Sequence, residues 1–307
     1  MTDSYDAIIV GGGIGGGAMA TVLARAGRSV LVLEKVRVYR DRVRGEWIAP
    51  WGVVEVKKLG LYDTLMAAGG HHVTQHRTYG DTLDPEAVES LPLTLVADVP
   101  GALCMGHPAM CATLQDAARA AGATFLVDVP EIAVTTGAQP AVAYTHDGTA
   151  HTARARIIIG ADGRGSIVRR AAGIKLHKDP THHMFGGMLI EGCAGFDETL
   201  QVIGAENDVH YLVFPQGKGR ARLYLGYSKQ HTQRFAGEDG QRAFLDAFRL
   251  ASLPGSEHIA NATPAGPCNS YPNEDAWTDV PYGEGVVLVA MRQATTTRSS
   301  DRGYPSR

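Results

Sequence analysis

The residues of this sequence best placed to do chemistry are glycines near its beginning. Gly11-Gly12-Gly13-Ile14-Gly15-Gly16 has the spacing G-x-G-x-x-G, and it lies between a strand-like run, Asp6 to Val10, and an alanine-rich helical run, Ala18 to Ala26. Glycines at these positions let backbone amides approach a pyrophosphate at the amino terminus of a helix. A glycine-rich turn that binds nothing is the alternative, because short motifs also arise by chance.

The residues after the next strand strengthen the case for a bound dinucleotide. Ser29 to Leu33 forms a second apolar run, and Glu34 and Lys35 follow it. An acidic side chain about 20 residues after the last glycine can accept hydrogen bonds from a ribose diol. A solvated surface glutamate is the alternative. The order of strand, glycines, helix, strand and acid favours dinucleotide binding, without separating NAD from FAD; the candidate ligands are Gly11, Gly13, Ile14, Gly15, Gly16, Glu34 and Lys35.

A second motif follows the apolar run Ile157 to Ile159, and it reads Gly160-Ala161-Asp162-Gly163-Arg164-Gly165-Ser166-Ile167-Val168-Arg169. Asp162 can cap the turn, and Gly163 can adopt a positive φ. Ser166 can cap the helix that bears Arg169. An ordinary strand-to-helix turn is the alternative. The segment resembles the second fingerprint of flavoprotein hydroxylases, and it therefore favours FAD as the dinucleotide.

Together the motifs resemble FAD-dependent monooxygenases of the single-component aromatic hydroxylase family, the para-hydroxybenzoate hydroxylase-like flavoproteins, over nearly all of residues 3–289. The resemblance implies that Asp162, Gly163, Ser166 and Arg169 help to shape the site of the flavin pyrophosphate and the reductant. It also implies that Arg44, in Arg42-Val43-Arg44-Gly45-Glu46, meets phosphate or the flavin ring. A solvated basic loop is the alternative there, and His107 stands where relatives often have arginine.

The same resemblance implies the chemistry. In such relatives NADH or NADPH reduces FAD, oxygen forms a flavin hydroperoxide, and one oxygen atom passes to an aromatic or similar small organic substrate. The flavin carries this chemistry, so no side-chain acid or base is nominated. A flavin-dependent halogenase, an isoprenoid-type reductase, a nicotinamide dehydrogenase and an inactive gene product are the alternatives. No Trp-x-Trp-x-Ile-Pro segment of the halogenase type is present.

The element pattern predicts an α/β protein whose style changes to extended segments after about residue 175. The resemblance implies a three-layer Rossmann-like FAD-binding domain with an inserted antiparallel β-sheet substrate domain. We expect residues 1–175 to form the first part of the FAD-binding domain, 176–272 the substrate domain, and 273–289 the return. Val209 to Phe214 and Arg220 to Tyr227 predict a hairpin with one polar face, carrying Arg220, Arg222 and Tyr224. The resemblance implies that one face of this sheet covers the flavin ring and lines the substrate pocket. A helix, Gly240 to Ala251, is predicted to close the region.

Composition limits the partners. The chain has 307 residues, 44% of them hydrophobic, and a formal charge of −3. Its basic residues are scattered, so we expect no nucleic acid and no membrane partner. The four cysteines and the pairs His71-His72 and His182-His183 lack metal-ligand spacing, which predicts no metal site. Nothing at the amino end resembles a signal peptide, so a cytoplasmic location is expected. The oligomeric state and the substrate's identity stay open.

A third fingerprint of the family is missing. It follows a strand like Gly285 to Val289 and begins Gly-Asp, with the aspartate holding the ribityl chain of the flavin. Here Val289 is followed by Ala290-Met291-Arg292-Gln293. Adding one guanine before the codon of Ala290 permits Gly-Asp-Ala-Ala-Gly-(Tyr or His)-Asn-Asp-Pro-Ile-Ile-Gly-Gln-Gly-Leu-Ser-Ile-Ala, which resembles that fingerprint. We therefore expect residues 290–307 to be an out-of-frame tail, from a mutation or a sequencing error.

This expectation predicts that the chain as written holds flavin poorly. Expressed as given, it should purify colourless or largely insoluble, because the elements for the ribityl chain are absent and apolar surface stays uncovered. Insertion of one guanine before codon 290 should give soluble yellow protein that oxidises NAD(P)H. Flavin absorbance of the two purified proteins checks the prediction. Near-stoichiometric FAD and hydroxylation by the 307-residue chain would contradict it.

Overall fold

The computed structural model describes residues 3–43, 46–193 and 195–289, and these residues form two compact units. Unit 1 comprises residues up to Val38, Leu114–Pro180 and residues from Asn273. Unit 2 comprises Tyr39–Thr113 and Thr181–Pro272. The expected first part of the FAD-binding domain, residues 1–175, is thus divided between the two units. Compact units are defined by contacts alone, so the functional domain boundaries stay a prediction.

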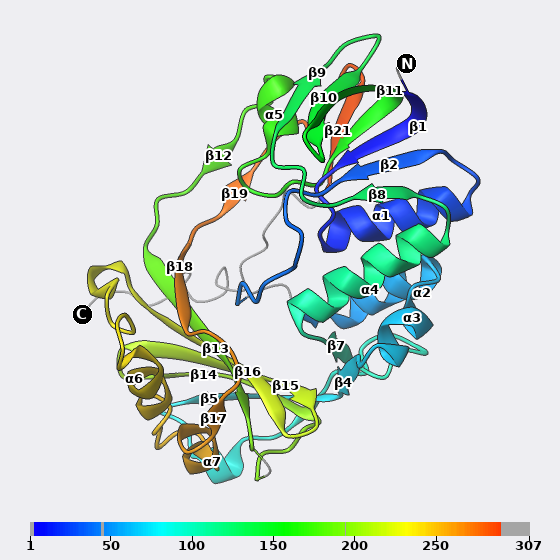
Figure 1. The fold of residues 1–307 in the computed structure, drawn as a ribbon. Coiled ribbons are helices and arrows are strands. Elements are labelled where there is room, and N and C mark those ends of the chain that lie inside the picture. The colour runs from blue at the N-terminus through cyan, green and yellow to red at the C-terminus, as the bar shows by residue number, and fades with distance from the viewer. Residues whose placement is uncertain (1–2, 44–45, 194, 290–307) are drawn as a thin grey trace. The chain divides into compact units, whose positions relative to one another are not determined.

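Unit 1 is built on a sheet of eight strands, of which five, β21, β11, β1, β2 and β8, are parallel (Figure 1). The order along its main path is β20-β21-β11-β1-β2-β8. The bounds are β1 Asp3–Val10, β2 Val30–Leu33, β8 Thr124–Leu126, β11 Thr149–Gly160, β20 Tyr282–Gly283 and β21 Val286–Leu288. Strands β9 (Ile132–Thr135) and β10 (Ala141–His146) extend the sheet antiparallel to the first half of β11.

Two apolar layers cover the faces of this sheet. Ala7 and Ile9 of β1 pack with Ala20 of helix α1 (Ile14–Arg25) and Ala118 of helix α4 (His107–Ala120). On the opposite face, Ile8 and Val10 pack with residues of β10 and of the short helix α5 (Ile167–Ala171). The alternation along β1 is what a strand buried on both sides requires. A two-stranded ribbon, β12 (His177–Lys178) with β19 (Ala276–Trp277), completes the unit.

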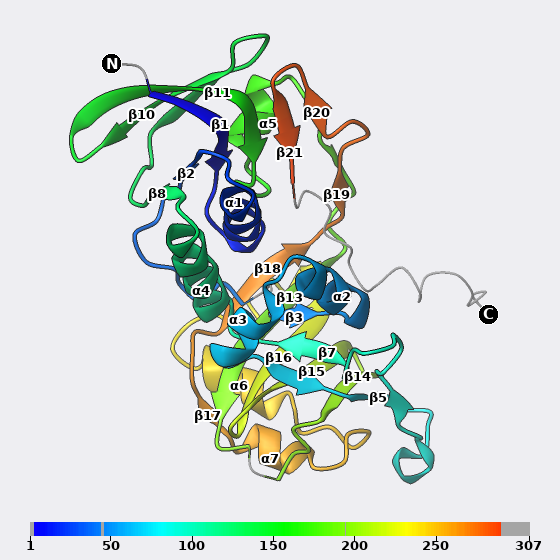
Figure 2. The same cartoon turned by 90° about the vertical axis from the view of Figure 1, so that its right-hand side faces the viewer.

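Unit 2 is built on a second sheet of eight strands, whose main path is β17-β13-β16-β15-β14-β5-β6 (Figure 2). The bounds are β5 Gln75–Gly80, β6 Leu91–Pro92, β13 His183–Glu191, β14 Leu200–Glu206, β15 Val209–Gly217, β16 Arg220–Ser228, β17 Thr263–Pro264 and β18 Asn269–Asn273. The predicted hairpin is confirmed, because β15 and β16 pair antiparallel. One pairing departs from the antiparallel expectation: β5 runs parallel to β14. That pairing places residues 75–80 in unit 2.

Shorter elements of unit 2 surround this sheet. A three-stranded sheet joins β3 (Trp47–Ile48), β7 (Ala102–Cys104) and β4 (His71–Val73). The helices are α2 (Pro50–Lys58), α3 (Tyr62–Ala67), α6 (Gly240–Asp246) and α7 (Ser256–Ala260), with single turns η1 (Pro85–Ala87) and η2 (Lys229–His231). The predicted α/β fold, with a mainly parallel sheet and a separate antiparallel one, is confirmed.

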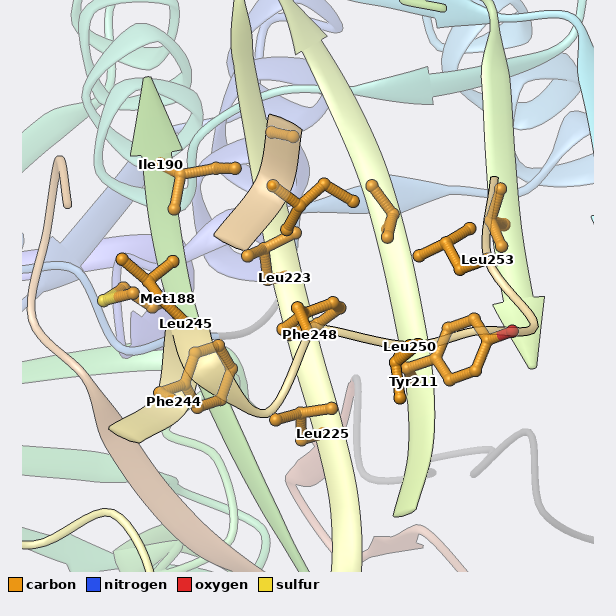
Figure 3. Close-up of a cluster of buried hydrophobic side chains, with 14 of the residues drawn as sticks. Met188, Ile190, Tyr211, Leu223, Leu225, Phe244, Leu245, Phe248, Leu250 and Leu253 are labelled. Carbon is orange, nitrogen blue, oxygen red and sulfur yellow. The ribbon is translucent and has the colours of Figure 1, made fainter. Parts of the chain in front are cut away.

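The core of unit 2 lies between one face of its large sheet and the segment around α6 (Figure 3). Leu223 and Leu225 of β16 contact this core together with Phe244 and Phe248. The helix predicted over Gly240 to Ala251 ends at Asp246, which corrects the sequence expectation. Beyond it, Phe248 N donates to Leu245 O in a tighter turn, and Phe248, Leu250 and Leu253 are all buried. A continued α-helix cannot point all three side chains at the sheet.

None of the helices in the described part of the chain combines the length and the apolar character that crossing a bilayer requires.

Candidate functional site

The glycine motif of unit 1 joins the end of β1 to the start of α1. Gly13 precedes the helix, no side chain caps this end, and the first turn carries no acidic residue. Close packing explains two of the glycines: a Cβ on Gly11 would lie 2.5 Å from Ala161 O, and one on Gly16 would lie 1.9 Å from Gly11 O. A Cβ on Gly13 would meet nothing within 4 Å. The helix amino terminus is therefore uncapped beside open space, which suits an anion.

Glu34 lies directly after β2 and is 7% exposed, so the surface alternative is wrong. Its Oε2 accepts a hydrogen bond from Gly12 N at 2.6 Å, and its Oε1 accepts one from Val36 N at 3.0 Å. Each carboxylate oxygen can accept about two hydrogen bonds, so acceptor capacity remains for a ribose hydroxyl. Glu34 thus holds the glycine loop in place, a role that the sequence did not reveal.

The second motif forms the predicted turn and cap. Ser166 Oγ accepts from Arg169 N at 2.9 Å at the start of α5, and Gly163 has a φ of +74°. Asp162 Oδ2 accepts from Ile167 N at 2.5 Å. Asp162 Oδ1 and Arg169 Nε are buried and have no hydrogen-bond partner among the described residues. Since Gly11 packs against Ala161, the structure brings the two motifs together at one edge of the sheet.

The remaining candidate residues from the sequence do not join the two motifs in the described part of the chain. Lys35 is exposed, and Arg44 lies outside the described residues, as does the tail 290–307. His72 is half-buried, and its Nε2 shares a hydrogen bond of 2.8 Å with the Tyr62 hydroxyl. Burial lowers the pKa of His72. His182 and His183 are exposed. In the described ranges no group of His, Cys, Asp or Glu side chains could hold a metal ion.

Unit 2 contains a buried ion cluster that the sequence did not indicate. Arg222 on β16 is 1% exposed. Its Nη2 donates to Asp41 Oδ2 at 2.6 Å and to Glu46 Oε1 at 2.7 Å. Its Nε lies 2.5 Å from Glu46 Oε2, an ion contact whose angle is not that of a hydrogen bond. The guanidinium is therefore held by two carboxylates from a distant part of the chain.

The cluster corrects the expectation of a simple polar face on the hairpin. Arg220 is exposed, but Arg222 and Tyr224 are buried, and the Tyr224 hydroxyl donates to Glu46 Oε2 at 3.1 Å. Burial alone would lower the pKa of Arg222, but the charges of Glu46 and Asp41 outweigh it and leave that pKa raised. Burial, and then the charge of Glu46, raises the pKa of Tyr224 well above its usual value. In this cluster Arg222 consequently stays charged and the Tyr224 phenol stays protonated.

A cavity of about 470 Å³ opens beside this cluster, wholly within unit 2. Its walls include Arg222, Glu46 and Gln216, with apolar residues such as Met105 and Leu189. Its volume lies in the range of small-molecule sites, about 300 to 1,000 Å³. Gln216 sits at an irregularity in the β15–β16 pairing, where Pro215 pairs with Ala221 and Gly217 with Arg220. The extra residue is a β-bulge, a feature that redirects a side chain.

The residues of unit 1 fit FAD as the bound group. The uncapped end of α1 suits the pyrophosphate, and Glu34 retains acceptor capacity for the adenosine ribose. The unpartnered Asp162 Oδ1 suits a ligand rich in hydroxyl groups. When bound, FAD supplies the redox chemistry that side chains lack.

A family described as "FAD binding domain" matches residues 4–242. Squalene monooxygenase of Mus musculus is 33% identical over 115 residues, which cover 38% of this chain and 20% of that protein. Digeranylgeranylglycerophospholipid reductase 1 of Methanococcoides burtonii is 27% identical over 86% of this chain and 64% of that protein. The chain therefore spans less than two thirds of either relative.

Among solved structures, the myxobacterial chondrochloren halogenase CndH, described as a variant of FAD-dependent halogenases, superposes with a TM-score of 0.81. It is 19% identical, and the superposition covers 97% of this chain and 71% of that one. At this identity the likeness concerns the fold.

The contribution of the Arg222 ion cluster to the stability of the protein can be measured by substitution. In the protein translated with one guanine inserted before codon 290 (the frame-restored protein), Arg222→Met should lower the free energy of unfolding by about 3 to 5 kcal/mol, because it leaves the buried carboxylate of Glu46 and the part-buried one of Asp41 without their ion partner. Adding Glu46→Gln should recover part of that loss, with a coupling of about 0.5 to 3 kcal/mol. Urea denaturation measures all three proteins. Arg242→Met, which breaks an exposed pair with Asp246, is the control and should cost under about 1 kcal/mol; equal costs at both arginines would contradict the argument.

Proposed function

This chain belongs to the FAD-binding domain family, and we propose that it is part of an NADH- or NADPH-dependent monooxygenase that hydroxylates an aromatic or similar small organic substrate. The observation that favours a small polar substrate is the cavity of unit 2, about 470 Å³ in volume, with the buried guanidinium of Arg222 in its wall. A long hydrocarbon would leave this polar wall without partners, which costs binding free energy. The cavity therefore argues against an isoprenoid chain as substrate.

In this proposal the residues of unit 1 hold the cofactor and those of unit 2 hold the substrate. The amides at the start of α1 bind the pyrophosphate, and Glu34 accepts from the ribose of the adenosine. Asp162 and Ser166 keep the second turn in shape through their bonds to Ile167 N and Arg169 N. Met105, Leu189 and the other apolar residues beside Arg222 would limit the water around a bound substrate.

No disulfide joins Cys104, Cys111, Cys193 and Cys268, all of which lie in the described part of the chain, and this is in keeping with a cytoplasmic location. Molecular oxygen is the second substrate.

Product analysis tests the function. The frame-restored protein is supplied with NADH or NADPH, oxygen, chloride and bromide, and a panel of small aromatic compounds. We expect one oxygen atom to appear in the product, and isotopically labelled oxygen gas should label it. A halogenated product would assign the chain to the halogenases, and a saturated carbon–carbon bond without added oxygen would assign it to the reductases; either result contradicts the proposal.

The cofactor assignment has its own test at Glu34. In the frame-restored protein, Glu34→Ala should weaken FAD binding by about 1 to 3 kcal/mol, the scale for losing an ionised hydrogen-bond acceptor. Glu34→Gln, which keeps one acceptor oxygen, should weaken FAD binding less than Glu34→Ala does. Fluorescence titration with FAD measures both, and Glu131→Ala, an exposed site in unit 1, is the control. Unchanged affinity in Glu34→Ala would remove this residue from the site.

A further inference from the structure

Two buried hydrogen-bond donors in the wall of the unit 2 cavity have neither a hydrogen bond nor an ion pair to any described residue. The Nη1 atom of Arg222 is one, and the Nε2 atom of Gln216 is the other; neither has a hydrogen-bond partner among the described residues. Both residues line the same cavity. The two N–H groups of Nη1 and the two of Nε2 are thus donors without acceptors.

The ion pairs of Arg222 and the backbone bulge at Gln216 hold these two donors in fixed positions in the cavity wall. The Arg222 side chain is nine-tenths or more buried, and its Nη2 and Nε are held by Glu46 and Asp41. These contacts hold one edge of the guanidinium, and Nη1 is left without an acceptor among the described residues. The bulge at Gln216 places a second donor in the same wall. A buried donor without an acceptor is costly, so such groups in a cavity point to a ligand.

We propose that this cavity binds a small organic acid, whose carboxylate accepts hydrogen bonds from Arg222 Nη1 and Gln216 Nε2. The inference rests on the proposed function, in which the cavity holds the substrate, and it names the chemical class of that substrate. Arg222 and Gln216 are then specificity-determining residues for the acid group.

The charges of the wall favour a carboxylate over other acceptors. Lys218 and Arg220, both exposed, line the same cavity and attract an anion to it. Asp41 and Glu46 also line it, so a phosphate dianion meets two like charges. Arg222, Lys218 and Arg220 against these two carboxylates leave a net charge of +1 in the wall, which a single carboxylate neutralises. A neutral amide satisfies the donors but not this charge.

The test compares a naphthalene carboxylate with the corresponding naphthalene carboxamide, which has the same shape without the charge. Binding is measured by calorimetry, without NAD(P)H, on the 307-residue chain and on the frame-restored protein. We expect the acid to bind at least about tenfold more tightly than the amide, since bonds to charged groups are the stronger class. Gln216→Leu should weaken acid binding by about tenfold or more.

Two further variants separate recognition from folding. Arg222→Lys keeps the positive charge beside Glu46 but lacks the planar fork of donors, so it should lose affinity for the acid while its circular dichroism is retained. Gln230→Leu, at an exposed glutamine of unit 2 outside this cavity, should bind the acid as the parent does. Equal affinity for acid and amide, absence of binding by the acid, or an unaffected Gln216→Leu would each overturn the inference.

The outcome is distinguishable from failure of the proposed function. Acid binding that depends on Gln216, without any oxygenated product, keeps this inference and rejects the monooxygenase. Oxygenation of neutral rings, with no preference for the acid, keeps the monooxygenase and rejects this inference.

Discussion

A guanidinium buried to 1% exposure is the constraint on which unit 2 depends. Removing a charge from water costs several kcal/mol unless opposite charges and hydrogen bonds replace the hydration. For Arg222 the replacements are Asp41 and Glu46, which lie 181 and 176 positions earlier in the chain. The segment around them must therefore pack with the large sheet. This requirement, together with the pairing of β5 with β14, accounts for residues 39–113 belonging to unit 2.

Unit 1 depends on a different constraint, which is the close approach of backbone segments that leaves no room for a Cβ atom at two glycines. Helix α1 comes so close to β1 that any Cβ on Gly16 would overlap Gly11 O. The turn after β11 also comes close, because a Cβ on Gly11 would lie 2.5 Å from Ala161 O. Small residues at these points let the two glycine-containing turns share one edge of the sheet, and Glu34 ties the first turn to β2. The approach of Gly16 to Gly11 joins residues close together in the sequence, which is why a motif can reveal it, whereas the approach of Gly11 to Ala161 joins two distant motifs.

That difference explains how much the sequence predicts. The strands β1 and β2, the hairpin β15–β16 and the cap at Ser166 follow from local periodicity and turn chemistry, and each is confirmed. The burial of Arg222 depends on carboxylates far away in the chain, and no local pattern shows it. Gln216 escapes notice for another reason, since a bulge is a slip in pairing that the sequence Pro215 to Gly219 does not specify. The early end of α6 reflects tertiary packing of Phe248 and Leu250.

The same long-range interaction determines what the cavity can discriminate. Glu46 and Asp41 neutralise Arg222 in part, but they occupy only its Nε and Nη2 atoms. The remaining donors belong to a rigid group whose rotamer is fixed by the ion pairs, so a ligand meets them without an ordering cost. A site with fixed, unsatisfied donors rejects a ligand that lacks the acceptor more strongly than an apolar pocket rejects a missing methyl group. In the proposed site, selectivity against hydrocarbons thus follows from the contacts that hold Asp41 and Glu46 against the sheet of unit 2, so that folding and substrate choice share one interaction.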